Sequence, residues 1–254
     1  MAKDDLISLY EYKKKDISNA LVVTGFPTIG IVGTIASRFV INALSLETIG
    51  AFFSDYFQPV TIISKGVPLP PVRIYAGDKK CGPDGRCEQI IVITSEFMPV
   101  PTIVRPLANK IIDWCEKKNC EFIVAIEGFN SGKEEDVPLY GIASTEKAKN
   151  FLKKYDVEIM QEGMVGGISG VLLYEGKQKG FNVICLLAGT HMEYPDAKAA
   201  AKILEVVNKM LPDIEIDPEP LYKEAEIIEQ QLKKFMKESQ PQKQVIPEAK
   251  IMYR

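Results

Sequence analysis

Leu21-Val22-Val23-Thr24-Gly25-Phe26-Pro27-Thr28-Ile29-Gly30-Ile31-Val32-Gly33 is the stretch that decides the fold of this chain. Its first residues form a short β-branched run typical of a buried strand, and the segment around Pro27 has the composition of a turn. The apolar segment Ile29 to Leu44 then predicts a helix that ends at Ser45. Residues 18–37 carry no charge over about the twenty residues that a membrane-spanning helix needs, but the turn inside them predicts a buried strand, turn and helix instead.

Short apolar, β-rich runs recur along the chain, separated by turns or by helical stretches. The predicted strands are Ala20 to Thr24, Thr48 to Phe53, Val60 to Ser64, Val72 to Ala76, Ile90 to Thr94, Phe122 to Ile126 and Val183 to Ala188. The predicted helices are Ile29 to Leu44, Thr102 to Lys118, Ser144 to Tyr155, Ile168 to Glu175 and Pro195 to Leu211. This alternation predicts an α/β fold with a mixed, mostly parallel sheet flanked by helices, part of it antiparallel between Val60 and Ile93.

Length and composition fit a folded cytoplasmic protein. The chain has 254 residues, 46% hydrophobic and 26% charged, which is long enough for a sizeable core and argues against disorder. Lys and Arg total 31 against 34 Asp and Glu, a net charge of -3, so there is no global basic surface for nucleic acid or anionic lipid. We therefore expect no nucleic-acid partner and no membrane partner.

The five cysteines are an odd number, and the N-terminus lacks the charged-then-apolar plan of a signal peptide, which together indicate a reducing compartment. Cys81 and Cys87 flank the turn-like segment Gly82 to Arg86, so a hairpin disulfide between them is geometrically possible. Reduced thiols are favoured in most cytosols, and the spacing disfavours a zinc site. We expect no metal and no cofactor.

Three regions are predicted along the chain: an α/β core domain over residues 1–211, a C-terminal helix within 212–238, and a flexible tail over 239–254. The helix has a narrow apolar seam formed by Leu221, Ala225, Ile228, Leu232 and Phe235. Such a seam either docks on the domain or forms the oligomer with a neighbouring subunit, and the sequence leaves both open. The tail contains two prolines, three glutamines and few apolar residues before its end.

Two glycine-containing segments resemble chemical motifs only loosely. The segment Gly25 to Gly33 lies between a strand and a helix, where an anion could bind, but it lacks the Lys and Ser or Thr of a nucleotide loop. We interpret Gly30 and Gly33 as sites of close helix-to-strand packing, with anion binding as the alternative. Ser169 lies between glycines, yet a nucleophile elbow needs glycine two residues later, where this chain has Val171.

Four polar residues follow predicted strands and could gather at the carboxyl edge of the sheet, where ligands usually bind. They are Asp55, Glu96, Glu127 and the single histidine, His191. Glu96, Glu127 and His191 support an alternative function, a small-molecule-binding protein or a hydrolase- or phosphorylase-like enzyme. The set forms no ordered motif, and polar residues at strand ends are also the ordinary result of strands reaching solvent. We therefore assign no catalytic residue.

The C-terminal tip, Met252-Tyr253-Arg254, is a second candidate site. It offers a free carboxylate that can pair with a lysine, a phenol that can anchor in a slot, and an apolar side chain that can be buried beside it. These three residues are the predicted partner-binding site.

At several places the sequence resembles the archaeal proteasome assembly chaperone homologues. The resemblance covers roughly residues 17–210 and rests on Gly25 to Gly33, Val67 to Pro71, Ile91 to Glu96 and Gly163 to Gly170. It implies an α/β fold similar to nucleoside phosphorylase-like domains, no demonstrated catalysis, and assembly as a homo-oligomer. The ending resembles the hydrophobic, tyrosine, any-residue motif with which proteasome activators dock between α-ring subunits.

By that likeness, Met252 would fill the apolar part of the pocket, Tyr253 would anchor, and the Arg254 carboxylate would meet a pocket lysine. The leading hypothesis is a non-enzymatic, ATP-independent chaperone or activator of the archaeal 20S proteasome. Several tails in one oligomer would bind the α-ring with avidity. A third hypothesis is a structural adaptor that binds another chaperone subunit.

Overall fold

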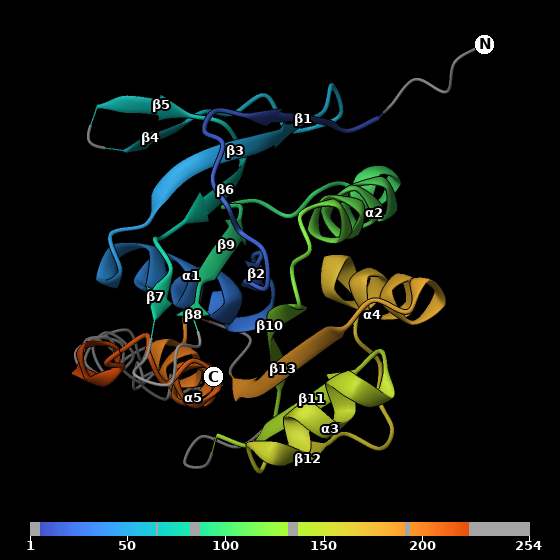
Figure 1. The fold of residues 1–254 in the computed structure, drawn as a ribbon. Helices are drawn as coiled ribbons and strands as arrows, with labels where there is room; N and C mark the ends of the chain where they lie inside the picture. The colour runs from blue at the N-terminus through green and yellow to red at the C-terminus, as the bar shows by residue number, and fades with distance from the viewer. Residues whose placement is uncertain (1–5, 65, 82–86, 132–136, 191–193, 224–254) are drawn as a thin grey trace, which may run out of the picture.

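A nine-stranded mixed sheet forms the centre of the computed structural model, which describes residues 6–64, 66–81, 87–131, 137–190 and 194–223 (Figure 1). The strands lie in the order β1-β3-β6-β9-β2-β10-β13-β11-β12. Their bounds, in that order, are Ser8–Glu11, Glu47–Phe53, Val72–Ala76, Ile90–Thr94, Leu21–Gly25, Phe122–Asn130, Val183–Thr190, Leu139–Ala143 and Glu158–Ile159.

The four strands in the middle of this sheet, β9, β2, β10 and β13, are parallel. Every residue of β2, β9 and β13 is buried, as expected for strands that are covered on both faces. Of the eight neighbouring pairs in the sheet, four are parallel and four antiparallel. The predicted α/β class is confirmed. Parallel pairing is concentrated in the centre of the sheet, and the antiparallel strand β6 lies between Val60 and Ile93, where antiparallel pairing was expected.

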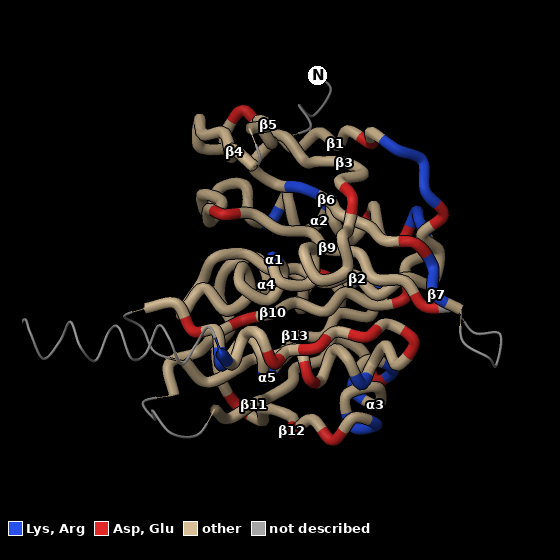
Figure 2. The backbone as a smooth tube through the Cα atoms, turned by 90° about the vertical axis from the view of Figure 1, so that its left-hand side faces the viewer, with Lys and Arg blue, Asp and Glu red and all other residues tan. Residues whose placement is uncertain are grey.

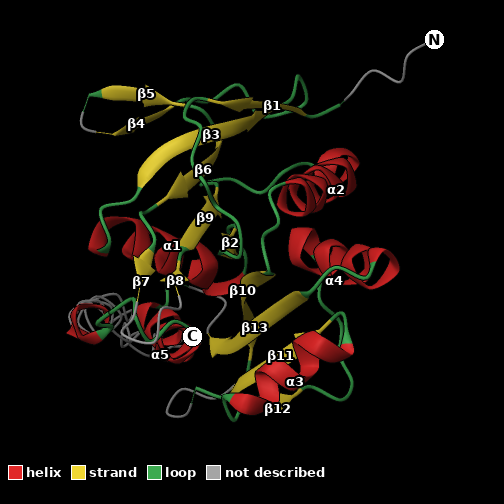
Figure 3. Ribbon diagram, viewed as in Figure 1, coloured by secondary structure: helices red, strands yellow, loops and turns green. Residues whose placement is uncertain are grey.

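Helices cover both faces of the sheet (Figure 3). The helices α1 (Val32–Ala43) and α5 (Ala197–Met210) pack on one face, and α2 (Pro101–Lys117) and α4 (Gly167–Lys179) pack on the other. The shorter α3 (Glu146–Lys154) packs against β11 and β12. Each of the five overlaps a predicted helix, because apolar residues recur at helical spacing in the sequence.

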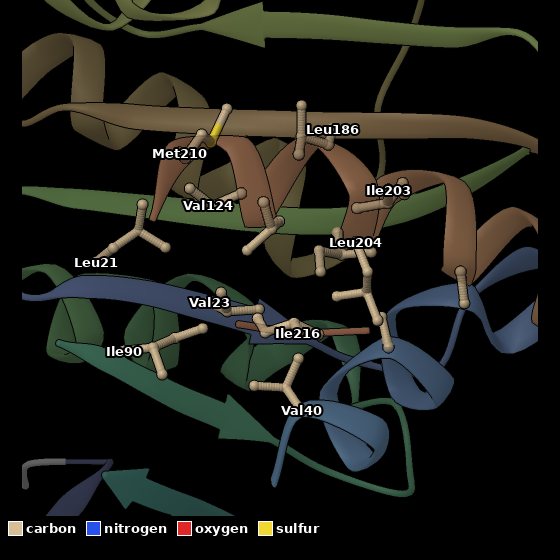
Figure 4. Close-up of a cluster of buried hydrophobic side chains, with 14 of the residues drawn as sticks. Leu21, Val23, Val40, Ile90, Val124, Leu186, Ile203, Leu204, Met210 and Ile216 are labelled. Atoms are coloured by element: carbon tan, nitrogen blue, oxygen red, sulfur yellow. The ribbon is translucent and has the colours of Figure 1, made fainter. Parts of the chain in front are cut away.

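Each face of the sheet has its own hydrophobic core. The first core lies between the sheet and α1 and α5, and includes Val23, Val124 and Leu186 (Figure 4). The second lies between the sheet and α2 and α4, and includes Val22 and Ile111. Successive residues of a strand point to opposite faces, so β2 supplies both cores.

Glycines allow the chain to approach itself closely around α1. A Cβ atom on Gly25 would lie 2.1 Å from the carbonyl oxygen of Gly33, and one on Gly33 would lie 2.5 Å from the carbonyl oxygen of Ile126. Gly30 has a φ of 63°, and a Cβ atom there would lie 2.2 Å from Thr190 Oγ1. The close packing predicted for Gly30 and Gly33 is confirmed.

Two short antiparallel ribbons lie outside the main sheet. One pairs β4 (Ile62–Ser64) with β5 (Val67–Leu69), and it projects from the sheet as an arm above α1 (Figure 1). The other pairs β7 (Lys80–Cys81) with β8 (Cys87–Glu88).

The β7–β8 ribbon corrects one expectation about the cysteines. Cys81 lies directly opposite Cys87 in the ribbon, and Cys81 is disulfide-bonded. The preference for reduced thiols is therefore wrong for Cys81. The physical reason is the register, because residues directly opposite in an antiparallel pair are about 4.5–5.5 Å apart at Cα, a separation that a disulfide can span.

The C-terminal helix begins on the core. Residues 219–223 are helical, and Leu221 is buried in the first hydrophobic core. Tyr222 Oη donates a hydrogen bond of 2.6 Å to Glu205 Oε1 of α5. The start of the helix, which holds Leu221 of the predicted seam, therefore contacts the domain. The choice between the two alternatives for the seam as a whole stays a prediction. The rest of that helix, and the tail over residues 239–254, lie outside the described residues.

The surface carries charges of both signs close together (Figure 2). Lysines near the N-terminal strand are matched by acids, in the pairs Lys13–Glu47, Lys15–Asp78 and Lys79–Asp16. In the part of the chain that the structure describes, no helix is long and apolar enough to cross a bilayer.

Candidate functional site

The ends of several strands meet at one edge of the sheet, called the carboxyl edge below. The strands β2, β9, β10 and β13 are parallel, and β3 runs in the same direction because it is antiparallel to β6, which is antiparallel to β9. Asp55 and Glu96 follow β3 and β9 at this edge. Glu127 lies in the part of β10 that extends past the last residue of β2, Gly25.

Glu96 is held by a buried arginine. The Arg73 side chain is 3% exposed, and its Nη2 donates to Glu96 Oε1. Arg73 Nε donates to Tyr75 Oη at 2.8 Å, and Nη1 donates to the carbonyl oxygen of Pro70 at 2.8 Å. Each guanidinium nitrogen has a partner, which is what allows a charge to remain buried.

Sequence reasoning did not single out Arg73. It reaches the carboxyl edge because β6 runs antiparallel to β9, which places Arg73 opposite Thr94, the last residue of β9. The available signal was a lone arginine inside the apolar strand Val72–Ala76, since a buried strand keeps such a residue only when a partner neutralises it.

Glu127 lies towards the other face of the sheet, against α4. It is 4% exposed and accepts a hydrogen bond of 2.5 Å from Ser169 Oγ in the first turn of α4. Burial raises the pKa of Glu127 to about 7, while the Ser169 hydroxyl and the neighbouring Thr28 side chain act to lower it. Glu127 therefore changes its charge near neutral pH.

The predicted edge residues do not form one catalytic group. Glu96 and Glu127 have different partners, and no hydrogen bond or ion pair joins these two acids among the described residues. Asp55 is exposed, and His191 lies outside the described residues. The sequence therefore predicts correctly that Glu96 and Glu127 lie at the carboxyl edge, but the two side chains do not form one cluster there.

The hydrogen bond between Ser169 and Glu127 joins the atoms of a nucleophile and a base. Both residues are buried, with Ser169 only 2% exposed, so a substrate cannot reach the hydroxyl in this structure. Within the described ranges, no group of three or more His, Cys, Asp or Glu residues is placed to hold a metal ion. This buried pair is therefore a packing contact between β10 and α4.

The predicted partner-binding residues, Met252, Tyr253 and Arg254, lie outside the described residues. Their role stays a prediction.

The protein has an α/β fold. The acids Glu96 and Glu127 at its carboxyl edge both accept hydrogen bonds from other residues of the chain. The chain belongs to the PAC2 family, whose sequence profile matches residues 22–236. An uncharacterized protein of Methanocaldococcus jannaschii is 38% identical over 231 residues, which is 91% of each chain.

Two solved structures from Pyrococcus furiosus have the same fold. PbaA, described as an archaeal homolog of proteasome-assembly chaperone, has a TM-score of 0.79 and 32% identity, covering 91% of this chain and 92% of its own. PbaB, described as an archaeal proteasome activator, has a TM-score of 0.80 and 25% identity, covering 91% and 99%. The resemblance to proteasome assembly chaperone homologues is confirmed.

Proposed function

We propose that this protein is an ATP-independent chaperone or activator of the archaeal 20S proteasome, acting in the cytoplasm and without enzymatic activity. The observation that carries the proposal is the similarity over 91% of the chain to PbaA and PbaB, which are described as a proteasome-assembly chaperone homolog and a proteasome activator. The burial of Ser169 and Glu127 supports a binding role over catalysis at the carboxyl edge.

Contact with the proteasome is assigned to the C-terminal tip. In this proposal Met252 fills the apolar part of a pocket between α-ring subunits, Tyr253 anchors in it, and the carboxylate of Arg254 pairs with a lysine. Residues 239–254, with their two prolines and three glutamines, act as the tether. A coil of this length spans roughly 20–25 Å, enough to carry the tip clear of the domain.

Several tips in one homo-oligomer would engage one ring. A second tip binds as an intramolecular partner once the first is bound, so modest single-site affinity becomes strong overall attachment.

We expect Tyr253→Ala, or deletion of Met252 to Arg254, to abolish co-elution with purified 20S particles in size-exclusion chromatography. Tyr253→Ala removes the anchoring phenol of the proposed docking, and the deletion removes the apolar, phenol and Arg254 carboxylate contacts together. The matched control is Gln242→Ala, which changes the tether but not the tip and should co-elute like the unaltered protein.

Light scattering on the same samples reports whether each variant keeps its oligomeric state. Unchanged association of the tip deletion with the 20S particle would refute tip docking while leaving the family assignment intact.

A further inference from the structure

A pocket with a volume of about 550 Å³ lies on the α1 side of the sheet, away from the Ser169–Glu127 pair. Arg38 and Ile41 of α1 line one part of it, the β4–β5 ribbon lines another, and Arg73 of β6 and Glu96, which follows β9, also line it. The volume is within the range of known ligand sites. We call it the ribbon pocket.

The β4–β5 ribbon lines this pocket with residues from both of its faces, which are Ile62, Ile63, Ser64, Val67 and Leu69. Ile62 pairs with Leu69, and Ser64 with Val67, so these residues share one face, and Ile63 and Pro68 share the other. Ile62 and Leu69 are partly buried, but Val67 on the same face is 54% exposed. The pocket therefore leaves apolar surface open beside Val67.

The ribbon also has unpaired strand edges. Among the described residues β4 and β5 pair only with each other, whereas β1, β3 and β6 continue into the main sheet. Pro68 has no backbone N–H, which weakens the edge of β5 as a template for another strand. The β4 edge, Ile62–Ser64, has no proline and can pair with an extended chain.

The charge of the pocket determines which extended peptides would complement it. Its charged lining residues are Arg38, Arg73 and Glu96, two positive against one negative, a net charge of +1. Arg73 is paired with Glu96, but Arg38 is exposed and forms no ion pair among the described residues. An acidic side chain next to apolar ones complements this surface.

We propose that the ribbon pocket binds an extended peptide segment of a partner protein that carries an acidic residue among β-branched apolar residues. The segment pairs with the β4 edge, its apolar side chains pack against Ile62, Val67 and Leu69, and its carboxylate pairs with Arg38. This site is independent of the proposed tail docking and requires no proteasome.

The test is fluorescence anisotropy of the full-length protein with a fluorescein-labelled peptide, Thr-Val-Thr-Asp-Thr-Val-Thr, in which the two valines and the aspartate share one face of the extended chain. We expect a Kd of about 10 μM, which is typical of a small interface. Val67→Asp should weaken binding at least about tenfold, because it puts a charge on the apolar wall. Arg38→Glu should weaken it similarly, and a peptide with Lys in place of Asp should recover binding to that variant.

Two controls distinguish binding at this site from nonspecific peptide binding. Met164→Asp removes a methionine that is 96% exposed in the loop before α4 and should leave the affinity unchanged. A peptide with alternate backbone nitrogens methylated should lose binding, because strand pairing needs those N–H groups.

Several results would overturn the proposal. These are no binding by the unaltered protein up to about 1 mM peptide, equal loss with Met164→Asp, or full binding by the methylated peptide. Light scattering provides a further check, because a Val67→Asp variant that changes oligomeric state without changing peptide affinity would make the ribbon a subunit interface instead.

Discussion

Gly25→Ala is expected to destabilise the protein by about 3 kcal/mol or more, at or above the upper end of overpacking effects. The added Cβ atom would lie 2.1 Å from the carbonyl oxygen of Gly33 and 2.1 Å from Ser37 Oγ. One of these atoms belongs to the backbone of α1, which can move only if the helix moves. The helix is fixed in turn by Gly33, which packs against the carbonyl oxygen of Ile126 in β10.

The measurement is thermal unfolding followed by circular dichroism. A loss of that size in a protein of this length lowers Tm by roughly 6–12 °C. If the variant is insoluble, Ser37→Ala combined with Gly25→Ala removes one of the two clashes and should recover part of the lost stability. A Gly25→Ala variant with the same Tm as the unaltered protein would contradict the close packing of α1 on β2.

The matched control is Gly163→Ala in the loop before α4. The added Cβ atom there meets only the flexible end of Met160, whose Sδ would lie 2.8 Å away. The Met160 side chain can rotate aside, so we expect a change within about 0.5 kcal/mol. The comparison separates the packing of one glycine from a general effect of replacing glycine.

Glu127→Gln is expected to change the pH dependence of stability. The pKa of Glu127 is raised in the folded protein from 4.5 to about 7, so the folded state holds this proton more tightly than the unfolded chain. The contribution of this bound proton to the free energy of unfolding is therefore fully present below about pH 4.5 and is lost as the pH rises through 7. The total is about 3 kcal/mol, at about 1.4 kcal/mol per pH unit.

Glutamine keeps an oxygen that can accept from Ser169 Oγ, but it carries no charge to desolvate. We expect Glu127→Gln to have nearly the same free energy of unfolding as the unaltered protein at pH 4.5, and to be more stable by about 3 kcal/mol at pH 8.5. Urea denaturation at the two pH values measures both quantities. The difference between variant and parent cancels the other titrating groups.

Glu162→Gln is the control for this second experiment, because Glu162 is exposed in the loop before α4. Its difference from the parent should not change with pH by more than about 0.5 kcal/mol. A Glu127→Gln curve parallel to the parent from pH 4.5 to 8.5 would mean that Glu127 is not buried in the way described.

The central strands could be predicted from sequence because they are continuous β-branched runs. Val72–Ala76 and Ile90–Thr94 have the predicted bounds. The strands missed outright are peripheral. β12 has only two residues, and β11 contains Gly141 in its middle, a residue that ordinarily argues against a strand. Gly141 is needed there because a Cβ atom would lie 2.8 Å from Leu152 of α3, a contact that no local pattern reveals.

The candidate site could be predicted only in part. The positions of Glu96 and Glu127 along the sheet follow from strand direction, but their partners depend on segments distant in sequence. Arg73 comes from an antiparallel strand, and Ser169 from a helix. Periodicity within one segment contains no information about such pairs, whereas the family resemblance rested on short motifs and could be recognised directly.

The place of β2 in the sheet has a consequence for synthesis of the protein on the ribosome. β2 is near the start of the chain, yet its two neighbours begin at Ile90 and Phe122. A nascent chain that has not yet emerged as far as β10 leaves one edge of β2, a strand that is wholly buried in the folded protein, without a partner. Such an edge attracts other chains, so the interval before β10 emerges is when this protein is most exposed to aggregation.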